Sequence, residues 1–393
     1  MKKELVAKIV VLTIVVLCVG QVIITSFSMV FTNEKIERGD GFALVKNADA
    51  QSLSPKNVIK GNDEGPHHNM VFNMGEWWYY NVYFIGNNTE LKNWFLVISY
   101  QLFSTFARIK LELFDDQNKS IGGDEVISFN DVRTSGPGVH LTFNNSSVEG
   151  EYPKWHLYAE FNGQEIVANL TFIANCLPEW LPDNTGNNFS TSSVGYYCVL
   201  NCTVYGTVSL NGTTHSVAGL GYHDHPWAPI SLKKLSENQL FNYPVFWKWL
   251  RVHLENGWDL FIGKISFQKH SLVSRSGPGD ICIATSRNTF YQLYWFRIDY
   301  LKTEKSSMPW ITIPTQVRIT AIFSDRLGMA GPIFFDLQYE ARNIREDLYS
   351  ENPPHFGYWT SQGNISGSIK SIRNTIPLTG WAVLETTADT RRF

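Results

Sequence analysis

The chain has 393 residues, of which 44% are hydrophobic and 18% are charged, and its formal net charge is −3 at pH 7. The length suits two domains of ordinary size, and the composition excludes an intrinsically disordered protein. Because basic residues form no run beyond the extreme N-terminus, the charge pattern gives no case for nucleic acid as a partner.

An apolar segment opens the chain. Lys2, Lys3 and Lys8 precede residues 9–31, which contain no charged residue and are long enough to span a bilayer. Lysines ahead of such a segment favour a cytoplasmic N-terminus with the rest of the chain outside. We interpret residues 1–31 as a signal anchor, with a cleaved signal peptide as the alternative. The protein is therefore expected to be membrane-anchored with extracytoplasmic domains, or secreted.

Residues 32–64 are polar, show no periodicity and are interpreted as a linker. From Gly65 onward, short runs of apolar residues alternate with turn residues, which is typical of β-strands. Asn-Gly at 211–212 and at 256–257 stands between two alternating runs, the strongest short signal for a hairpin. Ala341–Tyr349 is the candidate for a short helix.

Many short strands at regular spacing predict an all-β chain with two antiparallel β-domains. Pro229–Tyr243 interrupts the strand rhythm, so we assign residues 65–235 to the first domain and residues 236–393 to the second. The chain also contains 13 Trp, 17 Tyr and 25 Phe. A sheet-rich core accounts for most of these aromatic residues, and a pocket for a large apolar ligand would use others.

Two features beyond the first segment agree with export. Asn-x-Ser/Thr sequons are modestly more frequent than expected by chance. Of the five cysteines, all but Cys18 lie in the β-domains, where they permit two disulfides in an undetermined pairing or remain buried thiols. The sequons begin at Asn87, Asn118, Asn144, Asn145, Asn169, Asn188, Asn201, Asn211 and Asn364, and the cysteines are Cys176, Cys198, Cys202 and Cys282.

The most distinctive stretch is GYHDHPW, which ends at Trp227. On a strand, His223, His225 and Trp227 share one face, while Tyr222 and Asp224 share the other. Two histidines at i and i+2 could bind a metal, but the remaining histidines show no spacing that supplies further ligands, so we assign none. The structural alternative is a pair of core histidines hydrogen-bonded to a carboxylate from another strand.

A second stretch, MGEWWYYNVYF, places Glu76 within an aromatic strand. Glu76, Trp78 and Tyr80 share one face of this strand by alternation. A carboxylate in such surroundings must find a partner or become protonated. A histidine pair would satisfy it, so we predict that His223 and His225 contact Glu76.

A third stretch, FWKWLRVHLENGWDLF, places Trp247, Trp249, Arg251 and His253 on one face of a strand, and Asp259 follows the turn as a further possible acid. The alternative is an amphipathic strand at the surface, with the head of the arginine in water.

Taken together, these motifs resemble the carotenoid 1,2-hydratase (hydroxyneurosporene synthase), or AttH-like, family. The resemblance spans about residues 65–390 and includes Tyr358-Trp359 and the ending GWAVLETT, in which Glu385 is in register. The chain departs from the family pattern at Thr360, where Glu is usual, and at Pro226, where Asn is common. The resemblance implies two lipocalin-like β-barrels, an apolar isoprenoid-like substrate, and alkene hydration or cyclisation in a buried pocket.

Hydration of a trisubstituted alkene needs an undissociated acid, a group that activates water and aromatic faces that stabilise a cation. Asp224 or Glu76 is the candidate acid, and His223 or His225 the candidate base. We expect no cofactor. The alternative is a carrier that binds a lipid in the same cavity without chemistry. The residues expected to line the substrate site are Trp78, Tyr80, Trp227, Tyr222, Trp247, Trp249, Arg251 and Asp259.

Overall fold

The structure is a computed structural model in which nearly every described residue belongs to an antiparallel strand. Within residues 46–393, which form one unit, it describes residues 59, 61–67, 75–85, 90–102, 106–117, 119–161, 163, 165–180, 195–228, 246–266, 276–286, 289–323, 332–349 and 356–389. The segment 1–31, expected to be an anchor or signal, lies outside the described residues. So do Pro229–Tyr243, where the domain boundary is expected.

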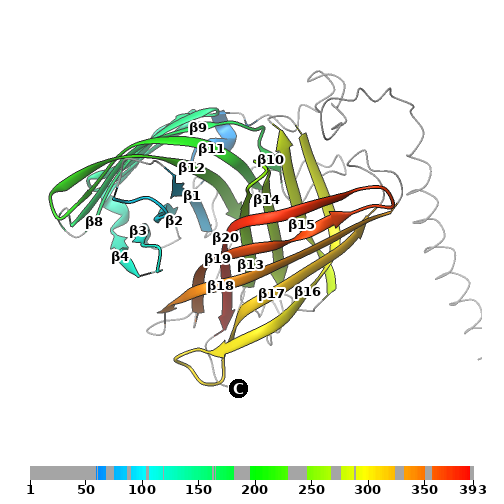
Figure 1. Cartoon of the computed structure of the whole chain (residues 1–393). Helices are drawn as coiled ribbons and strands as arrows, with labels where there is room; N and C mark the ends of the chain where they lie inside the picture. The colour runs from blue at the N-terminus through cyan, green and yellow to red at the C-terminus, as the bar shows by residue number, and fades with distance from the viewer. Residues whose placement is uncertain are drawn as a thin grey trace, which may run out of the picture. The chain divides into compact units, whose positions relative to one another are not determined.

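The first domain is a single sheet that rolls over its own core (Figure 1). The strand order is β4-β3-β2-β1-β12-β11-β9-β8-β7-β6-β5, and β10 pairs with β11. The sheet is an open half-barrel, since no pairing joins β4 to β5 among the described residues. Its elements are α2 (Gly61–Glu64), β1 (Gly75–Phe84), β2 (Phe95–Leu102), β3 (Ala107–Phe114), β4 (Ser120–Ile127), η2 (Phe129–Asp131), β5 (Val132–Thr134), β6 (Val139–Phe143), β7 (Ser146–Glu151), β8 (Lys154–Phe161), β9 (Ile166–Ala174), β10 (Glu179–Trp180), β11 (Gly195–Leu210) and β12 (Thr213–Ala228).

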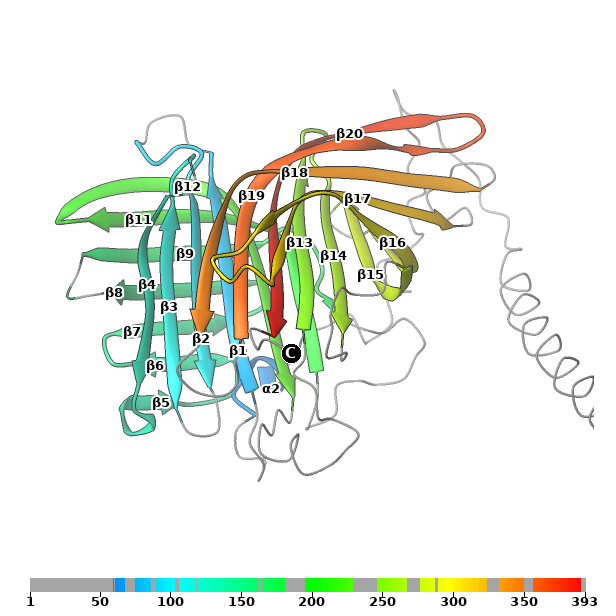
Figure 2. The ribbon, with the colours of Figure 1, turned by 90° about the horizontal axis from the view of Figure 1, so that it is seen from below.

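The second domain is a closed barrel in which each strand pairs with the next in sequence and β20 pairs with β13 (Figure 2). The chain therefore has the predicted all-β fold of two lipocalin-like domains. The strands of the barrel are β13 (Phe246–Leu254), β14 (Asp259–Ser266), β15 (Ser276–Ser286), β16 (Thr289–Lys305), β17 (Thr312–Phe323), β18 (Ile333–Tyr349), β19 (Phe356–Lys370) and β20 (Thr375–Asp389).

Turn chemistry explains the longest hairpin. Asn211 and Gly212, with φ of 46° and 83°, connect β11 to β12, and Leu210 pairs with Thr213. Two successive residues with positive φ make the turn type whose twist matches that of paired strands, which is why Asn-Gly favours it.

The prediction of a helix at Ala341–Tyr349 is wrong, because these residues continue β18. They pair with β19 as far as Tyr349 and Phe356, with one register shift between Ala341 and Asn343. The charged residues of this segment suit an exposed helix, but pairing with β19 in the closed barrel makes the segment a strand.

The two domains share one continuous core, which includes Trp249, Phe261 and Val383 of the barrel. The side chains of β1, and those of β12 from Gly219 to Trp227, are consequently mostly buried on both faces of the first sheet, rather than alternating between core and solvent. We call the face that packs on the core of the first domain the inner face, and the face that packs on the barrel the outer face.

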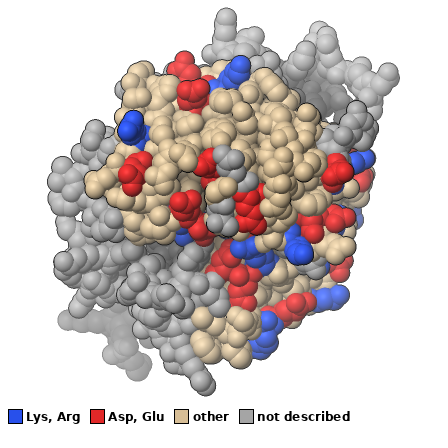
Figure 3. Space-filling model, turned by 90° about the vertical axis from the view of Figure 1, so that its left-hand side faces the viewer, with Lys and Arg blue, Asp and Glu red and all other residues tan. Residues whose placement is uncertain are grey.

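All four cysteines of the β-domains are buried free thiols, so the alternative of two disulfides is not what the structure contains. The last residues of the expected linker form α2, and Glu64 within it is buried. In the described part of the chain, no helix combines the length and apolarity needed to cross a membrane. On the face of the molecule in Figure 3, acidic and basic side chains are interspersed.

Candidate functional site

Pairing of β1 with β12 places the two central motifs side by side. Glu76 is opposite Trp227, Tyr80 is opposite His223, and Tyr79 is opposite Asp224. Alternation then sends Glu76 and Trp227 to the inner face and Asp224 to the outer face.

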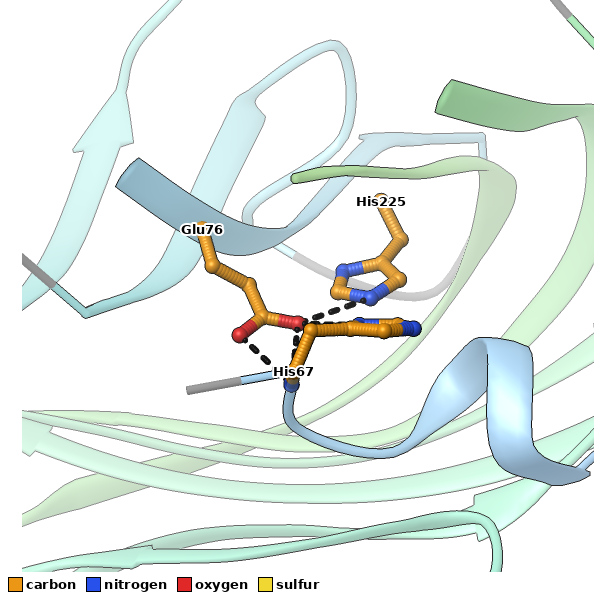
Figure 4. A group of neighbouring side chains, drawn as sticks. All are labelled: His67, Glu76 and His225. Atoms are coloured by element: carbon orange, nitrogen blue, oxygen red, sulfur yellow. Dashed lines mark hydrogen bonds and ion pairs between the residues drawn. The ribbon is translucent and has the colours of Figure 1, made fainter. Parts of the chain in front are cut away.

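The inner face holds a group of three side chains that point toward one another (Figure 4). His67 Nδ1 lies 2.7 Å from Glu76 Oε1, and His225 Nε2 lies 3.3 Å from the same oxygen. Glu76 and His225 are fully buried, and the side chain of His67 is 9% exposed. We call His67, Glu76 and His225 the inner cluster.

His67 joins this cluster from outside the two motifs. It follows α2, and its backbone N–H donates to Glu76 Oε2 at 2.9 Å. The indole ring of Trp227 stacks on its imidazole with ring centres 4.1 Å apart. Sequence reasoning missed His67 because it lies on no strand, so no strand periodicity relates it to Glu76 or His225. The adjacent pair His67-His68 was its only signal.

His225 is held from two sides. Its Nδ1 lies 2.9 Å from the carbonyl oxygen of Trp77, and Trp78 stacks on its ring with centres 4.5 Å apart. Burial lowers the pKa of His225 despite the neighbouring carboxylate of Glu76. Burial alone would raise the pKa of Glu76, but its contacts with His225 and His67 outweigh that effect and lower it. Glu76 is therefore an ionised carboxylate, which does not suit the role of proton donor.

His223 is separate from the inner cluster, although it shares the inner face. Its Nδ1 lies 3.1 Å from the carbonyl oxygen of Tyr79, its Nε2 lies 3.2 Å from the hydroxyl of Tyr197, and Tyr80 stacks on its ring at 4.2 Å. Burial lowers its pKa well below the ordinary value. The predicted contact with Glu76 thus holds for His225 and is wrong for His223.

Asp224 faces the opposite way, so it cannot share a reacting centre with the inner cluster. Its Oδ2 accepts hydrogen bonds from the hydroxyls of Tyr222 at 2.9 Å and Tyr196 at 3.2 Å. Its Oδ1 is buried without a hydrogen-bond partner among the described residues. Burial raises the pKa of Asp224 well above its ordinary value, while the tyrosine hydroxyls oppose this rise and the negative charge of Glu385 adds to it.

The barrel completes the surroundings of Asp224. The indole N–H of Trp249 donates to the hydroxyl of Tyr222 at 3.2 Å, and the hydroxyl of Tyr79 donates to Glu385 at 2.7 Å. These side chains are at most 8% exposed. Together with Asp224 and the partly buried Tyr196, they form what we call the outer cluster, which consists of Asp224, Tyr222, Tyr196, Tyr79, Trp249 and Glu385.

Arg251 lies beside the outer cluster and is 1% exposed, so the alternative of a surface arginine is wrong. Its guanidinium donates to Asn81 and to the carbonyl oxygen of Leu220 at the boundary between the domains. The rings of Tyr222 and Trp381 lie 5.7 Å and 5.2 Å from the guanidinium carbon. These contacts join the domains and leave Arg251 little freedom to bind a substrate.

Asp259 is bound by His253 Nδ1 at 2.9 Å and by the side-chain amide of Asn201. The structure therefore places this second possible acid in contacts of its own, separate from those of Asp224. The strand position of Trp247 is described, but its side chain is outside the described residues.

The barrel contains a small cavity that borders the outer cluster at Trp249. Its volume is ≈ 20 Å³, so its walls must move apart to admit a ligand larger than water. Most of the lining is aliphatic or aromatic, and the polar exceptions include Lys248 and Thr386. Burial and the charge of nearby Lys264 lower the pKa of Lys248 to about 7.

Comparisons with known proteins agree with this fold. No family model and no curated protein matches the sequence. Among solved structures, a protein provisionally assigned as AttH from Nitrosomonas europaea has a TM-score of 0.60 and 14% identity, covering 84% of this chain and 96% of its own. Kievitone hydratase from Nectria haematococca has a TM-score of 0.56 and 14% identity, covering 91% and 96%. CghA bound to Sch210972 has a TM-score of 0.57 and 9% identity, covering 81% and 90%.

Proposed function

We propose that this chain is an enzyme of the hydratase or cyclase type, which acts on an apolar, isoprenoid-like substrate beside the outer cluster. The observation that carries the proposal is the carboxyl group of Asp224. It is buried among aromatic rings, two tyrosines hold one of its oxygens, and the other oxygen has no partner among the described residues. That arrangement suits a group that gives a proton to a substrate carbon.

The proposed reaction follows from the chemistry of an alkene. The Asp224 carboxyl gives its proton to the less substituted carbon of the double bond, and the π electrons form the new C–H bond. The other carbon becomes a tertiary cation, which the faces of Tyr222 and Trp249 stabilise. Water then adds to the cation, and the added water loses a proton to the carboxylate of Glu385. Transfer of that proton to the ionised Asp224 restores the acid. If a second double bond of the substrate attacks the cation instead, a ring forms, and the new cation loses a proton to the carboxylate of Glu385 to give a cyclic isomer.

Glu385 is the proposed base. Its carboxylate reaches the interface from the barrel and is oriented by the hydroxyl of Tyr79. Two carboxyl groups in different surroundings divide the work of an acid and a base, as the reaction requires. Tyr79 is a positioning residue in this scheme.

Most inner-face residues have an indirect part in this proposal. Glu76, His223 and His225 lie across the sheet from Asp224, as do Trp78, Tyr80 and Trp227, so they fix the strands that carry the acid. The apolar part of the substrate would extend past Trp249 into the barrel. Trp249 lines the cavity of the barrel and also contacts Tyr222. We propose that the protein lies outside the cytoplasm, because the apolar segment 9–31 and the sequons are typical of exported chains.

A carrier without chemistry is the second candidate, and the nearly apolar lining of the barrel cavity favours it. The fold is also similar to that of a hydratase, kievitone hydratase, and this likeness supports an enzyme over a carrier.

Native mass spectrometry of the full chain in mild detergent, after incubation with a lipid extract, separates the two candidates. The enzyme releases a bound lipid that is heavier by one water molecule, or an isomer of it with a new ring. A lipid that is bound and released unchanged would instead establish the carrier.

A further inference from the structure

The inner cluster brings together three atoms of the types that bind transition metals. His67 Nδ1, a carboxylate oxygen of Glu76 and a ring nitrogen of His225 all lie within 4.8 Å of one another. They come from the segment after α2, from β1 and from β12, and their side chains converge (Figure 4). Two imidazoles and a carboxylate are a common ligand set for zinc and related divalent ions.

The orientation of His225 carries the argument furthest. Its Nδ1 faces the carbonyl oxygen of Trp77, which can only accept, so Nδ1 bears the hydrogen. In the neutral imidazole, Nε2 then presents a lone pair. Nε2 is buried without a hydrogen-bond partner among the described residues, and it points at a carboxylate oxygen 3.3 Å away. A positive charge must lie between these two atoms, and a metal ion would supply it as a proton on Nε2 would.

The Trp77 carbonyl has the place of an outer-shell partner. Histidines that bind metals usually donate their other N–H to a backbone carbonyl or a carboxylate, which fixes the tautomer and the ring. Glu76 is similarly held, because the backbone N–H of His67 donates to its Oε2 at 2.9 Å and to its Oε1 at 3.1 Å. Its Oε1 also faces the two imidazole rings. Stacking on Trp227 and Trp78 fixes both imidazoles.

The spacing also suits an ion. Ligand atoms around a tetrahedral zinc ion, each at about 2.0–2.1 Å, are about 3.3 Å apart. His225 Nε2 and Glu76 Oε1 already have this separation, whereas His67 Nδ1 and Glu76 Oε1, at 2.7 Å, would have to move apart by about 0.6 Å.

We propose that His67, Glu76 and His225 bind one divalent transition-metal ion of the zinc class. The ion would connect the segment that precedes β1 to the central strands of the first domain. Its place on the inner face separates it from the outer cluster, so this inference stands or falls independently of the proposed reaction.

Cobalt(II) titration of the full chain, after removal of metals with a chelator, tests the proposal. Wild-type protein should bind one equivalent, with the visible absorption bands of a site that contains nitrogen ligands, and zinc should displace the cobalt. His225→Gln and Glu76→Gln should each weaken binding by about 100-fold or more. The matched control is His253→Gln, which breaks a His–Asp contact of 2.9 Å with no third metal ligand among the described residues, and it should bind as the wild type does.

Wild-type protein that takes up no stoichiometric cobalt or zinc would overturn the proposal. So would Glu76→Gln or His225→Gln protein that binds as tightly as the wild type. If a variant does not fold, the wild-type titration and the rise in its unfolding temperature with added zinc still decide the question, since an ion that binds only the folded state must stabilise it.

Discussion

Trp249 determines which way the hydroxyl of Tyr222 points. An indole N–H can only donate, so the Tyr222 oxygen accepts from Trp249 at 3.2 Å, and its own hydrogen is directed to Asp224 at 2.9 Å. A residue of the barrel thereby orients the hydrogen bond that holds the buried carboxyl of the first domain. Trp249 is a positioning residue, and the site is complete only when both domains are in contact.

Tyr79→Phe should destabilise the protein by about 1–3 kcal/mol, because it removes one buried hydrogen bond to the Glu385 carboxylate. The free energy of unfolding in urea measures the effect. Tyr83→Phe is the matched control, since that hydroxyl bonds Asn93 at an exposed position, and it should cost less than about 0.5 kcal/mol. Equal losses in the two variants would contradict the account of the interface.

Glu64 should make stability depend on pH. Burial raises its pKa from 4.5 to about 7, so the folded state holds this proton more tightly than the unfolded state does. Its contribution is fully present below about pH 4.5 and is lost as the pH rises through 7, by about 3 kcal/mol in all. The difference in unfolding free energy between the wild type and Glu64→Gln, measured from pH 4 to pH 9, should fall along this course. A flat difference would contradict it. The groups around Glu64 are Tyr152, Trp155, Glu151 and Asp63.

Lys248 should make the free energy of unfolding depend on pH in the opposite direction. Burial and the cross-strand neighbour Lys264 lower its pKa from 10.5 to about 7, so the unfolded state binds the proton more tightly. Stability from this group therefore increases as the pH rises above 7. At pH 7, Lys248→Met should raise the free energy of unfolding by about 2–4 kcal/mol, and this gain should shrink toward pH 10. A destabilised variant at pH 7 would contradict this sign and would mean that the ring of Tyr300, 5.1 Å from Lys248 Nζ, outweighs the cost of burial.

Gly195→Ala should disturb the packing of Trp227 against the inner cluster. A Cβ at this position would lie 2.1 Å from the ring of Trp227, which stacks on His67. The expected loss is about 1–3 kcal/mol by urea unfolding, with a shift in tryptophan fluorescence. The control is Gly123→Ala, where the nearest atom is a ring carbon of Phe161 at 3.3 Å, and the loss should be smaller.

The all-β class and the alternation along β1 and β12 could be predicted from sequence, because successive side chains of a strand point to opposite faces of the sheet. The Asn211-Gly212 hairpin could be predicted for a similar reason, since the turn needs two residues with positive φ. Those arguments stop at the strand. They could not show that the outer face of β12 is covered by a second domain, which is what buries Asp224.

Contacts between distant segments explain the remaining differences. His67 reaches Glu76 from a segment without periodicity, and Arg251 is buried by the partner domain rather than exposed on a strand surface. Ala341–Tyr349 is a strand because β19 pairs with it, a contact that no local pattern encodes. In each case the decisive partner is far away in the sequence.

The central claim is that Asp224, rather than Glu76, supplies the proton. The most direct test compares conversion of a bound lipid by Asp224→Asn and Glu76→Gln proteins, both shown to be folded by their urea transitions. We predict that Asp224→Asn loses conversion by about 100-fold or more while it still binds the lipid, and that Glu76→Gln retains most of it. Conversion by Asp224→Asn at the wild-type rate would contradict the account.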